Sequence, residues 1–106
     1  MIKTSRTLSV LAVAGCLAGS MGFAQATGEA VYKANCQSCH GSTGTPSPGI
    51  AKAMGVKAAS DPDMKKLSLE DEIQAVKNGK GKMKAFGGKL TDAQIKDSVT
   101  YYRTLK

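Results

Sequence analysis

Apolar positions in the C-terminal half of the chain recur three or four residues apart, which is the spacing of an amphipathic helix. The pattern predicts one helix over 68–78, with Ile73 and Val76 on its apolar side, and a last helix over 92–104. The same spacing predicts a first helix over 28–39. Because the sequence has no internal repeat and no alternating strand pattern, we expect an all-α fold.

Polar residues mark where the two later helices begin and end. Ser68 is the expected N-cap of the first of them, and the acidic residues 70–72 place negative charge in its first turn, where the helix dipole favours it. Gly79 ends this helix. The run Thr91-Asp92-Ala93-Gln94 is a capping box that opens the last helix.

Two loops separate the predicted helices. Residues 41–49 are dense in glycine, serine and proline, which predicts an irregular connection. A short helical piece over 50–54 follows, and the Asp-Pro pair at 61–62 predicts a turn. The second loop, 80–90, is rich in glycine and lysine. Met83 is therefore presented by a loop and not by a helix.

The N-terminus has the three parts of a secretory signal peptide. Lys3 and Arg6 give it a basic start, an apolar stretch follows, and Ala24-Gln25-Ala26 is a small-residue cleavage site. The apolar stretch is shorter than the roughly 20 residues that a membrane-spanning helix needs. We therefore expect a signal peptide over 1–26, one domain over 27–106, and a periplasmic or otherwise exported location.

Cys16 offers a second processing route. Residues 13–16, Val-Ala-Gly-Cys, resemble the lipobox of bacterial lipoproteins, in which the cysteine is lipidated and becomes the new N-terminus. The opposing interpretation is that Cys16 is a small apolar residue within the signal. We favour cleavage after Ala26, because that site lies just before the start of the domain, and keep a lipid anchor on Cys16 as the alternative.

The run Cys36-Gln37-Ser38-Cys39-His40 has the arrangement used for covalent attachment of c-type haem. Each of the two vinyl groups of the porphyrin takes one cysteine sulfur as a thioether, and the adjacent imidazole can then bind the iron. Cys36 and Cys39 are the expected anchors and His40 the proximal ligand. The chain contains one histidine, so a second imidazole from the same molecule is excluded.

Other chemistries use the same Cys-x-x-Cys spacing. A zinc site needs about four ligands, and beyond Cys36, Cys39 and His40 no cysteine or histidine remains in residues 27–106. A redox-active dithiol stays open as an alternative, although the sequence lacks the βαβ pattern that usually surrounds one. An ordinary local disulfide of an exported protein also stays open.

Charge and composition limit the classes of partner that the protein is expected to bind. The formal net charge is +7, and Lys3 and Arg6 of the predicted signal contribute two of these charges. The remaining positive bias suits an acidic protein or an anionic membrane surface. Nucleic acid is not expected as a partner, because no basic run is interleaved with aromatic residues. A buried porphyrin would supply apolar mass that so short a chain lacks.

With these features in this order, the chain resembles the class I c-type cytochromes of the small bacterial kind. The resemblance covers residues 28–105: the haem motif comes first, Pro48 follows His40 by eight residues, and residues 78–88 resemble the methionine loop of the family. It implies a cytochrome c fold, with about four helices around one haem c bound covalently through two cysteines.

The helix crossing of the family has counterparts here too. Gly28 and Tyr32 match the positions where the first helix crosses the last, and Tyr101 resembles the tyrosine that meets them. Two residues depart from the pattern. Lys84 stands where a proline commonly follows the ligand methionine, which predicts a less rigid loop, and Ser98 replaces a usual aliphatic residue on the last helix.

The resemblance implies that His40 and Met83 are the axial ligands of the iron, and that the backbone carbonyl of Pro48 accepts a hydrogen bond from the second ring nitrogen of His40. Two further methionines need consideration. Met64 lies among charged residues and is expected to be solvated, whereas Met54 is expected to pack in the core. Met83 has glycines nearby, which allow a loop to approach the porphyrin closely.

The implied function is that of a monomeric one-electron carrier, not an enzyme, because both axial positions are filled. The implied partners are redox proteins with acidic docking surfaces, including a membrane-bound oxidase or reductase complex. Five lysines would form the cationic docking face, unless they serve only solubility: Lys52, Lys80, Lys82, Lys84 and Lys89. The alternatives are a haem enzyme or gas sensor in which Met83 dissociates, and a thiol–disulfide oxidoreductase.

Overall fold

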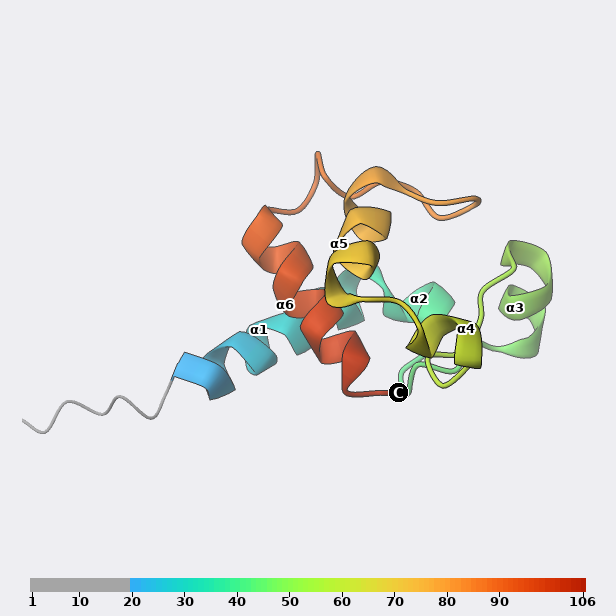
Figure 1. Ribbon diagram of the computed structural model, residues 1–106, viewed down its shortest axis with the longest axis horizontal. Coiled ribbons are helices and arrows are strands. Elements are labelled where there is room, and N and C mark those ends of the chain that lie inside the picture. Colours follow the sequence, from blue (N-terminus) through green and yellow to red (C-terminus); the bar gives the residue numbers. More distant parts are fainter. Residues whose placement is uncertain (1–19) are drawn as a thin grey trace, which may run out of the picture.

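The computed structural model describes the backbone of residues 20–106 and the side chains from residue 27 onward. The predicted lipidation residue Cys16 and most of the predicted signal peptide lie outside the described residues. Six helical segments follow one another in this part of the chain: α1 (Ser20–Asn35), α2 (Gln37–His40), α3 (Pro48–Met54), α4 (Pro62–Lys65), α5 (Leu69–Asn78) and α6 (Asp92–Arg103). Figure 1 shows their arrangement.

The prediction of an all-α fold is confirmed, since the described residues form helices and a single isolated bridge between Lys80 and Met83. The segments number more than the four that were expected, because three of them are short. Within the described residues, no helix is both long enough and apolar enough to span a bilayer.

Local capping chemistry sets the ends of α5 and α6 as the sequence predicts. The Ser68 side chain accepts a hydrogen bond from the backbone N–H of Asp71, and the Asp71 carboxylate accepts one from the N–H of Ser68. Thr91 and Gln94 form the same reciprocal pair at the start of α6. Each capping box satisfies two N–H groups that have no partner inside the helix.

Several predicted boundaries were wrong. The first helix starts at Ser20 and not at residue 28, and α3 starts at Pro48, within the predicted loop, and not at residue 50. The first helix does not run through to Cys39, because the backbone at Cys36 has φ −116°, far from the helical value, so that α1 ends at Asn35 and α2 begins anew. The pair at 61–62 starts a helix where a turn was expected. Asp61 caps α4 by accepting a hydrogen bond from the N–H of Asp63 at 2.9 Å, and Pro62 occupies the first helical position, where its missing N–H costs nothing.

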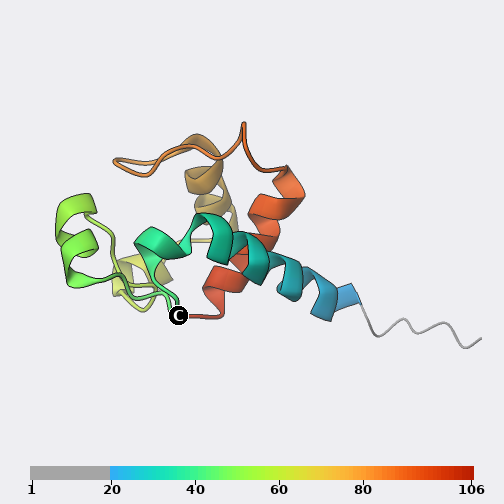
Figure 2. The same ribbon diagram turned by 180° about the vertical axis from the view of Figure 1, so that it is seen from behind.

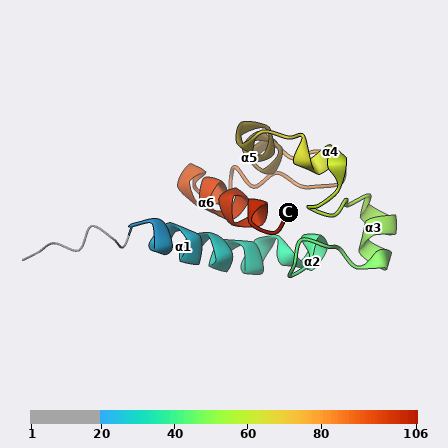
Figure 3. The same cartoon turned by 60° about the horizontal axis from the view of Figure 1, so that its bottom comes forward.

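The helices α1 and α6 cross at close range, and α5 packs on another side of α6 (Figures 1 and 2). Figure 3, turned so that the bottom of Figure 1 comes forward, shows α6 between α1 and α5. A Cβ atom built on Gly28 would overlap the carbonyl oxygen of Asp97 and lie 3.3 Å from the Cβ of Tyr101. The predicted crossing at Gly28 is therefore confirmed, and it requires a residue without a side chain.

Aromatic rings continue this contact toward the interior. The rings of Tyr32 and Tyr101 have their centroids 5.3 Å apart, and Tyr32 lies 6.1 Å from Tyr102. Tyr32, Ala59 and Tyr102 form a buried cluster. Ser98, the departure noted on α6, is buried and donates its hydroxyl hydrogen bond to the Ile95 carbonyl at 2.9 Å, so its polar atom is satisfied within its own helix.

We expect Gly28→Ala to destabilise the protein by roughly 1–3 kcal/mol, because the added methyl group must force the two backbones apart. Denaturant unfolding followed by circular dichroism would measure this loss. Gly49→Ala in α3 is the matched control, since a Cβ at Gly49 meets nothing within 4 Å. Equal stability of the two variants would contradict the tight crossing.

Candidate haem pocket

A cavity of about 1050 Å³ opens between the helices. Its walls come from the C-terminal end of α1, from α2, α3, α4, α5 and α6, and from the loop that follows α5. The predicted anchors Cys36 and Cys39, the predicted proximal ligand His40 and the predicted distal ligand Met83 all line it. Pro48 does not belong to the lining residues. The structure thus brings four of the five predicted site residues to one cavity.

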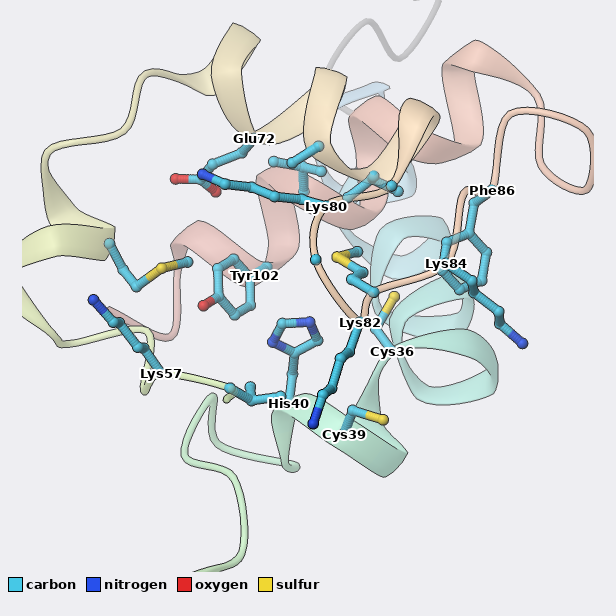
Figure 4. Close-up of a pocket in the computed structure, with 18 of the residues that line it drawn as sticks. Cys36, Cys39, His40, Lys57, Glu72, Lys80, Lys82, Lys84, Phe86 and Tyr102 are labelled. Carbon is cyan, nitrogen blue, oxygen red and sulfur yellow. The ribbon is translucent and has the colours of Figure 1, made fainter. Parts of the chain in front are cut away.

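Cys36 and Cys39 stand at the junction of α1 and α2 and are free, partly buried thiols. Figure 4 shows them on one side of His40, with Tyr102 and Glu72 on the other side. Burial raises the pKa of Cys36 to about 11, and the neighbouring Cys39 adds to the effect. Nucleophilic thiols of redox enzymes need a lowered pKa, so this environment does not favour dithiol chemistry.

His40 ends α2 and points into the cavity (Figure 4). Its ring lies edge-on to Tyr102, with the centroids 5.4 Å apart. Burial lowers the pKa of the imidazole, because the charged form loses solvation. A neutral imidazole is the form that binds a metal.

The chain next to His40 is held by Tyr32, whose hydroxyl donates a hydrogen bond to the Gly41 carbonyl at 2.5 Å. Burial raises the pKa of Tyr32, and the phenol is therefore a donor over the whole physiological range. This bond spans nine residues and links the core helix α1 to the end of the haem motif.

The expected partner of the second ring nitrogen is not in place. His40 Nδ1 is buried and makes no hydrogen bond within the described residues. Pro48 is exposed at the first position of α3, where its missing N–H suits the start of a helix, whereas Pro46 is buried. The hydrogen bond to the Pro48 carbonyl is unformed here, and the role of Pro48 stays a prediction.

Met83 sits in a tight turn after α5. Lys80 and Met83 exchange two backbone hydrogen bonds of 3.0 Å each, and Gly81 between them has φ +58°, which glycine adopts without strain. Lys82 donates a side-chain hydrogen bond to the carbonyl of Ala53 at 2.7 Å. The turn is thus closed on itself and attached to α3, although no proline follows Met83.

The expectations for the other two methionines were reversed. Met54 is 37% exposed and does not pack in the core, whereas Met64 is partly buried against the cluster of Tyr32, Ala59 and Tyr102. Both also line the cavity. The reason is that α4 turns Met64 inward while its charged neighbours face solvent, an orientation that the run of charges in the sequence does not reveal.

Glu72 is a site residue that the sequence reading missed. It was assigned to the helix dipole, but it is buried with 5% exposure, lines the cavity, and pairs with Arg103 at 2.7 Å and Lys106 at 2.6 Å. A signal was available, because Glu72 precedes Val76 by four residues and so lies on the same side of α5.

The donor set fits a covalently attached haem. The cavity offers the two thiols of the Cys-x-x-Cys-His motif, an imidazole that points into it, and the thioether of Met83 from the loop after α5. Apolar side chains such as Val99 and Phe86 supply the remaining wall. Within the described residues, the same walls hold no further histidine that could compete with Met83.

Comparisons with known proteins agree with this fit. A family model described as "Cytochrome C oxidase, cbb3-type, subunit III" matches residues 23–101. The chain is 35% identical to "Cytochrome c6" of Gracilaria tenuistipitata var. liui over 74 residues, which cover 70% of this chain and 66% of that protein. It is 40% identical to "Cytochrome c6" of Leptolyngbya boryana over 76 residues, covering 72% of this chain and 86% of that protein. The chain thus spans just under two thirds of the Gracilaria protein.

A solved structure supports the same relationship. The "KustC0563 c-type cytochrome" superposes with a TM-score of 0.67 at 30% sequence identity, covering 74% of this chain and 96% of that one. The match therefore takes in nearly all of a known cytochrome fold. The family match, the named relatives and the pocket chemistry lead to one conclusion: this chain belongs to the family of class I c-type cytochromes, which carry covalently attached haem c.

Proposed function

We propose that this cytochrome is a monomeric carrier of single electrons, with one haem c linked to Cys36 and Cys39 and with His40 and Met83 as axial ligands. The observation that carries the proposal is that these four residues, from α2, its N-terminal junction and the loop after α5, line one cavity. When bound, haem supplies an iron that changes its oxidation state by one, and ligation by histidine and methionine is typical of electron-transfer cytochromes.

The surrounding residues suit this role. The Tyr102 ring contacts the His40 ring edge-on. The bridge between Lys80 and Met83 closes the turn that carries the methionine, in the loop after α5. Two filled axial positions leave none for a substrate. We therefore propose that the protein is not an enzyme and that electrons pass through the edge of the bound group.

A second candidate is a haem enzyme or gas sensor in which Met83 dissociates. Two observations favour it. Lys82 and Lys84, which flank Met83, are both exposed, and position 84 does not hold a proline. The hydrogen bond from Lys82 to Ala53 opposes it, because that contact attaches the turn to α3. We rank the electron carrier first for this reason.

We propose that lysines around the cavity form the docking face for acidic redox partners, such as a membrane-bound oxidase or reductase complex. All five lysines named from the sequence are exposed. Three of them, Lys80, Lys82 and Lys84, also border the cavity, whereas Lys52 and Lys89 do not. Charges at this rim would steer encounter more than they would tighten binding.

We also propose that residues 1–26 direct export and are removed. The helix α1 continues through the proposed cleavage site, and among the residues whose side chains the structure describes, Gly28, Val31 and Tyr32 contribute to its contacts with α6 and the core. Cleavage after Ala26 keeps these three residues. A lipid anchor on Cys16 remains the alternative, and the mass of the exported protein distinguishes the two.

The purified protein should carry one haem, which its intact mass would show. In the oxidised state it should have the weak absorption band at the red end of the spectrum that the iron–methionine bond produces. Loss of that band at neutral pH would favour the enzyme or sensor. A mass without haem, together with two titratable thiols, would contradict the electron carrier and point to a thiol–disulfide oxidoreductase.

Replacing Met83 with alanine should lower the reduction potential by a sizeable part of the roughly 0.8 V that axial ligands span, and should open the iron to added ligands such as imidazole. Haem should stay attached, because Cys36 and Cys39 are unchanged. Met64→Ala and Met54→Ala are the matched controls, since both methionines line the same cavity. If Met83→Ala kept the native potential, one of these two would have to be the ligand.

Charge reversal at the cavity rim should slow electron transfer to an anionic acceptor. We expect Lys84→Glu to lower the rate constant with hexacyanoferrate(III) by about threefold to tenfold at low ionic strength, and the loss should vanish near 1 M salt, where screening is nearly complete. Lys96→Glu is the control, because Lys96 is also exposed, lies on α6 and does not line the cavity. Equal rate constants for the two variants would contradict the docking face and indicate that these lysines serve only solubility.

A further inference from the structure

The ion pairs of Glu72 join the middle of the chain to its C-terminal end. The Oε1 atom of Glu72 accepts hydrogen bonds from Arg103 Nη1 at 2.7 Å and from Lys106 Nζ at 2.6 Å. The same two donors also reach backbone carbonyls, Arg103 that of Leu67 at 3.2 Å and Lys106 that of Met64 at 2.9 Å. Each cation is thus fixed by two acceptors, and the carboxylate is fixed by both cations.

The two oxygens of Glu72 have different surroundings. While Oε1 holds both cations, Oε2 is buried and makes no hydrogen bond within the described residues. Glu72 lines the cavity, and neither Arg103 nor Lys106 does. The carboxylate therefore faces the cavity and the two cations lie behind it. A group in the cavity would be nearer to Glu72 than to Arg103 or Lys106.

Four lysines also line the cavity, Lys57, Lys80, Lys82 and Lys84, but all four are exposed, so that water and salt screen their charges, and the ion pairs of Glu72 within the described residues are those with Arg103 and Lys106. The Tyr102 hydroxyl is buried and unpaired beside Glu72, and burial, with a smaller contribution from Glu72, raises its pKa to about 12, so that it is neutral at physiological pH. The acidic residues Asp63 and Asp71 also line the cavity, but both are exposed, and Asp63 pairs with Lys57 at 2.7 Å. Glu72 is the buried acidic residue of the wall.

Figure 4 shows Glu72 and Tyr102 on the side of His40 away from Cys36 and Cys39. The carboxylate and the two thiols thus belong to different parts of the wall of one cavity, and a group bound there would have both nearby. A buried charge is screened far less than an exposed one, so its effect reaches across the cavity.

We propose that the Glu72 carboxylate, held in place by Arg103 and Lys106, lowers the reduction potential of the bound haem. Uptake of one electron from a donor protein reduces the positive charge of the iron by one unit, and a nearby anion favours the more positive, oxidised form. Glu72 accordingly acts through its negative charge and is not proposed as a ligand of the iron. This inference rests on the proposed electron-carrier function.

The test is the midpoint potential of the haem-loaded Glu72→Gln variant, which keeps the shape of the side chain and removes its charge. We expect a rise that corresponds to about a tenfold change in the ratio of reduced to oxidised protein, or about 59 mV for one electron. Glu70→Gln is the matched control, because Glu70 is an exposed residue of the same helix and does not line the cavity. A shift no larger than that of the control, or one toward lower potential, would overturn the proposal.

A second variant keeps the proposal testable if Glu72→Gln does not fold. Lys106→Gln removes one cation while Arg103 still holds the carboxylate, and the potential should then move downward. A merely structural role would lower the stability of both variants without shifting their potentials in opposite directions. An unchanged or raised potential in Lys106→Gln would count against the proposal.

The two proposals can fail separately. If the wild-type protein carries haem but lacks the iron–methionine band, the Met83 assignment fails, and the effect of Glu72 on the potential can still be measured. If the wild type shows the band and Glu72→Gln behaves as Glu70→Gln does, the inference about Glu72 alone fails. A wild-type protein without haem would overturn both.

Discussion

The close crossing of α1 and α6 is the contact on which the rest of the structure depends. Because Gly28 has no side chain, the backbone of α6 at Asp97 can approach α1 directly. One turn later, Tyr32 is buried between the helices, and its hydroxyl holds the Gly41 carbonyl just beyond the haem motif. The Tyr102 ring of α6 belongs to the same buried cluster as Tyr32 and contacts the His40 ring edge-on. The pocket geometry therefore follows from a helix packing contact and not from the motif alone.

The pocket keeps its charges in two separate places. Lysines such as Lys80 and Lys84 are exposed at the rim, where water and salt screen them, so they act mainly on the encounter with a partner. Glu72 lies inside the wall, where screening is weak and its effect falls on the equilibrium of the bound group. A buried carboxylate would be costly alone, and Arg103 and Lys106 offset that cost.

The capping boxes of the two later helices, which depend on neighbours in sequence, were predicted well. The caps at Ser68 and Thr91 appear as expected, because a cap is made by residues three positions apart. The haem motif is equally local, and its chemistry can be read from Cys36 to His40 without a fold. The wrong helix boundaries, such as those at Cys36 and Asp61, were local errors, whereas the others concern orientation: Met54 is exposed and Met64 is packed, the reverse of the expectation.

The amino-acid sequence alone was enough to predict the helical class, the capping boxes and the residues able to hold a haem. Each of these depends on spacing within a few turns of the chain. Two features required the folded molecule. One is the burial of Glu72, which depends on cations 31 and 34 residues away in the sequence. The other is the surroundings of His40, where the fold supplies Tyr102 as a neighbour and leaves Nδ1 without a partner. Long-range contacts of this kind depend on how α1, α5 and α6 pack, and no local pattern encodes that packing.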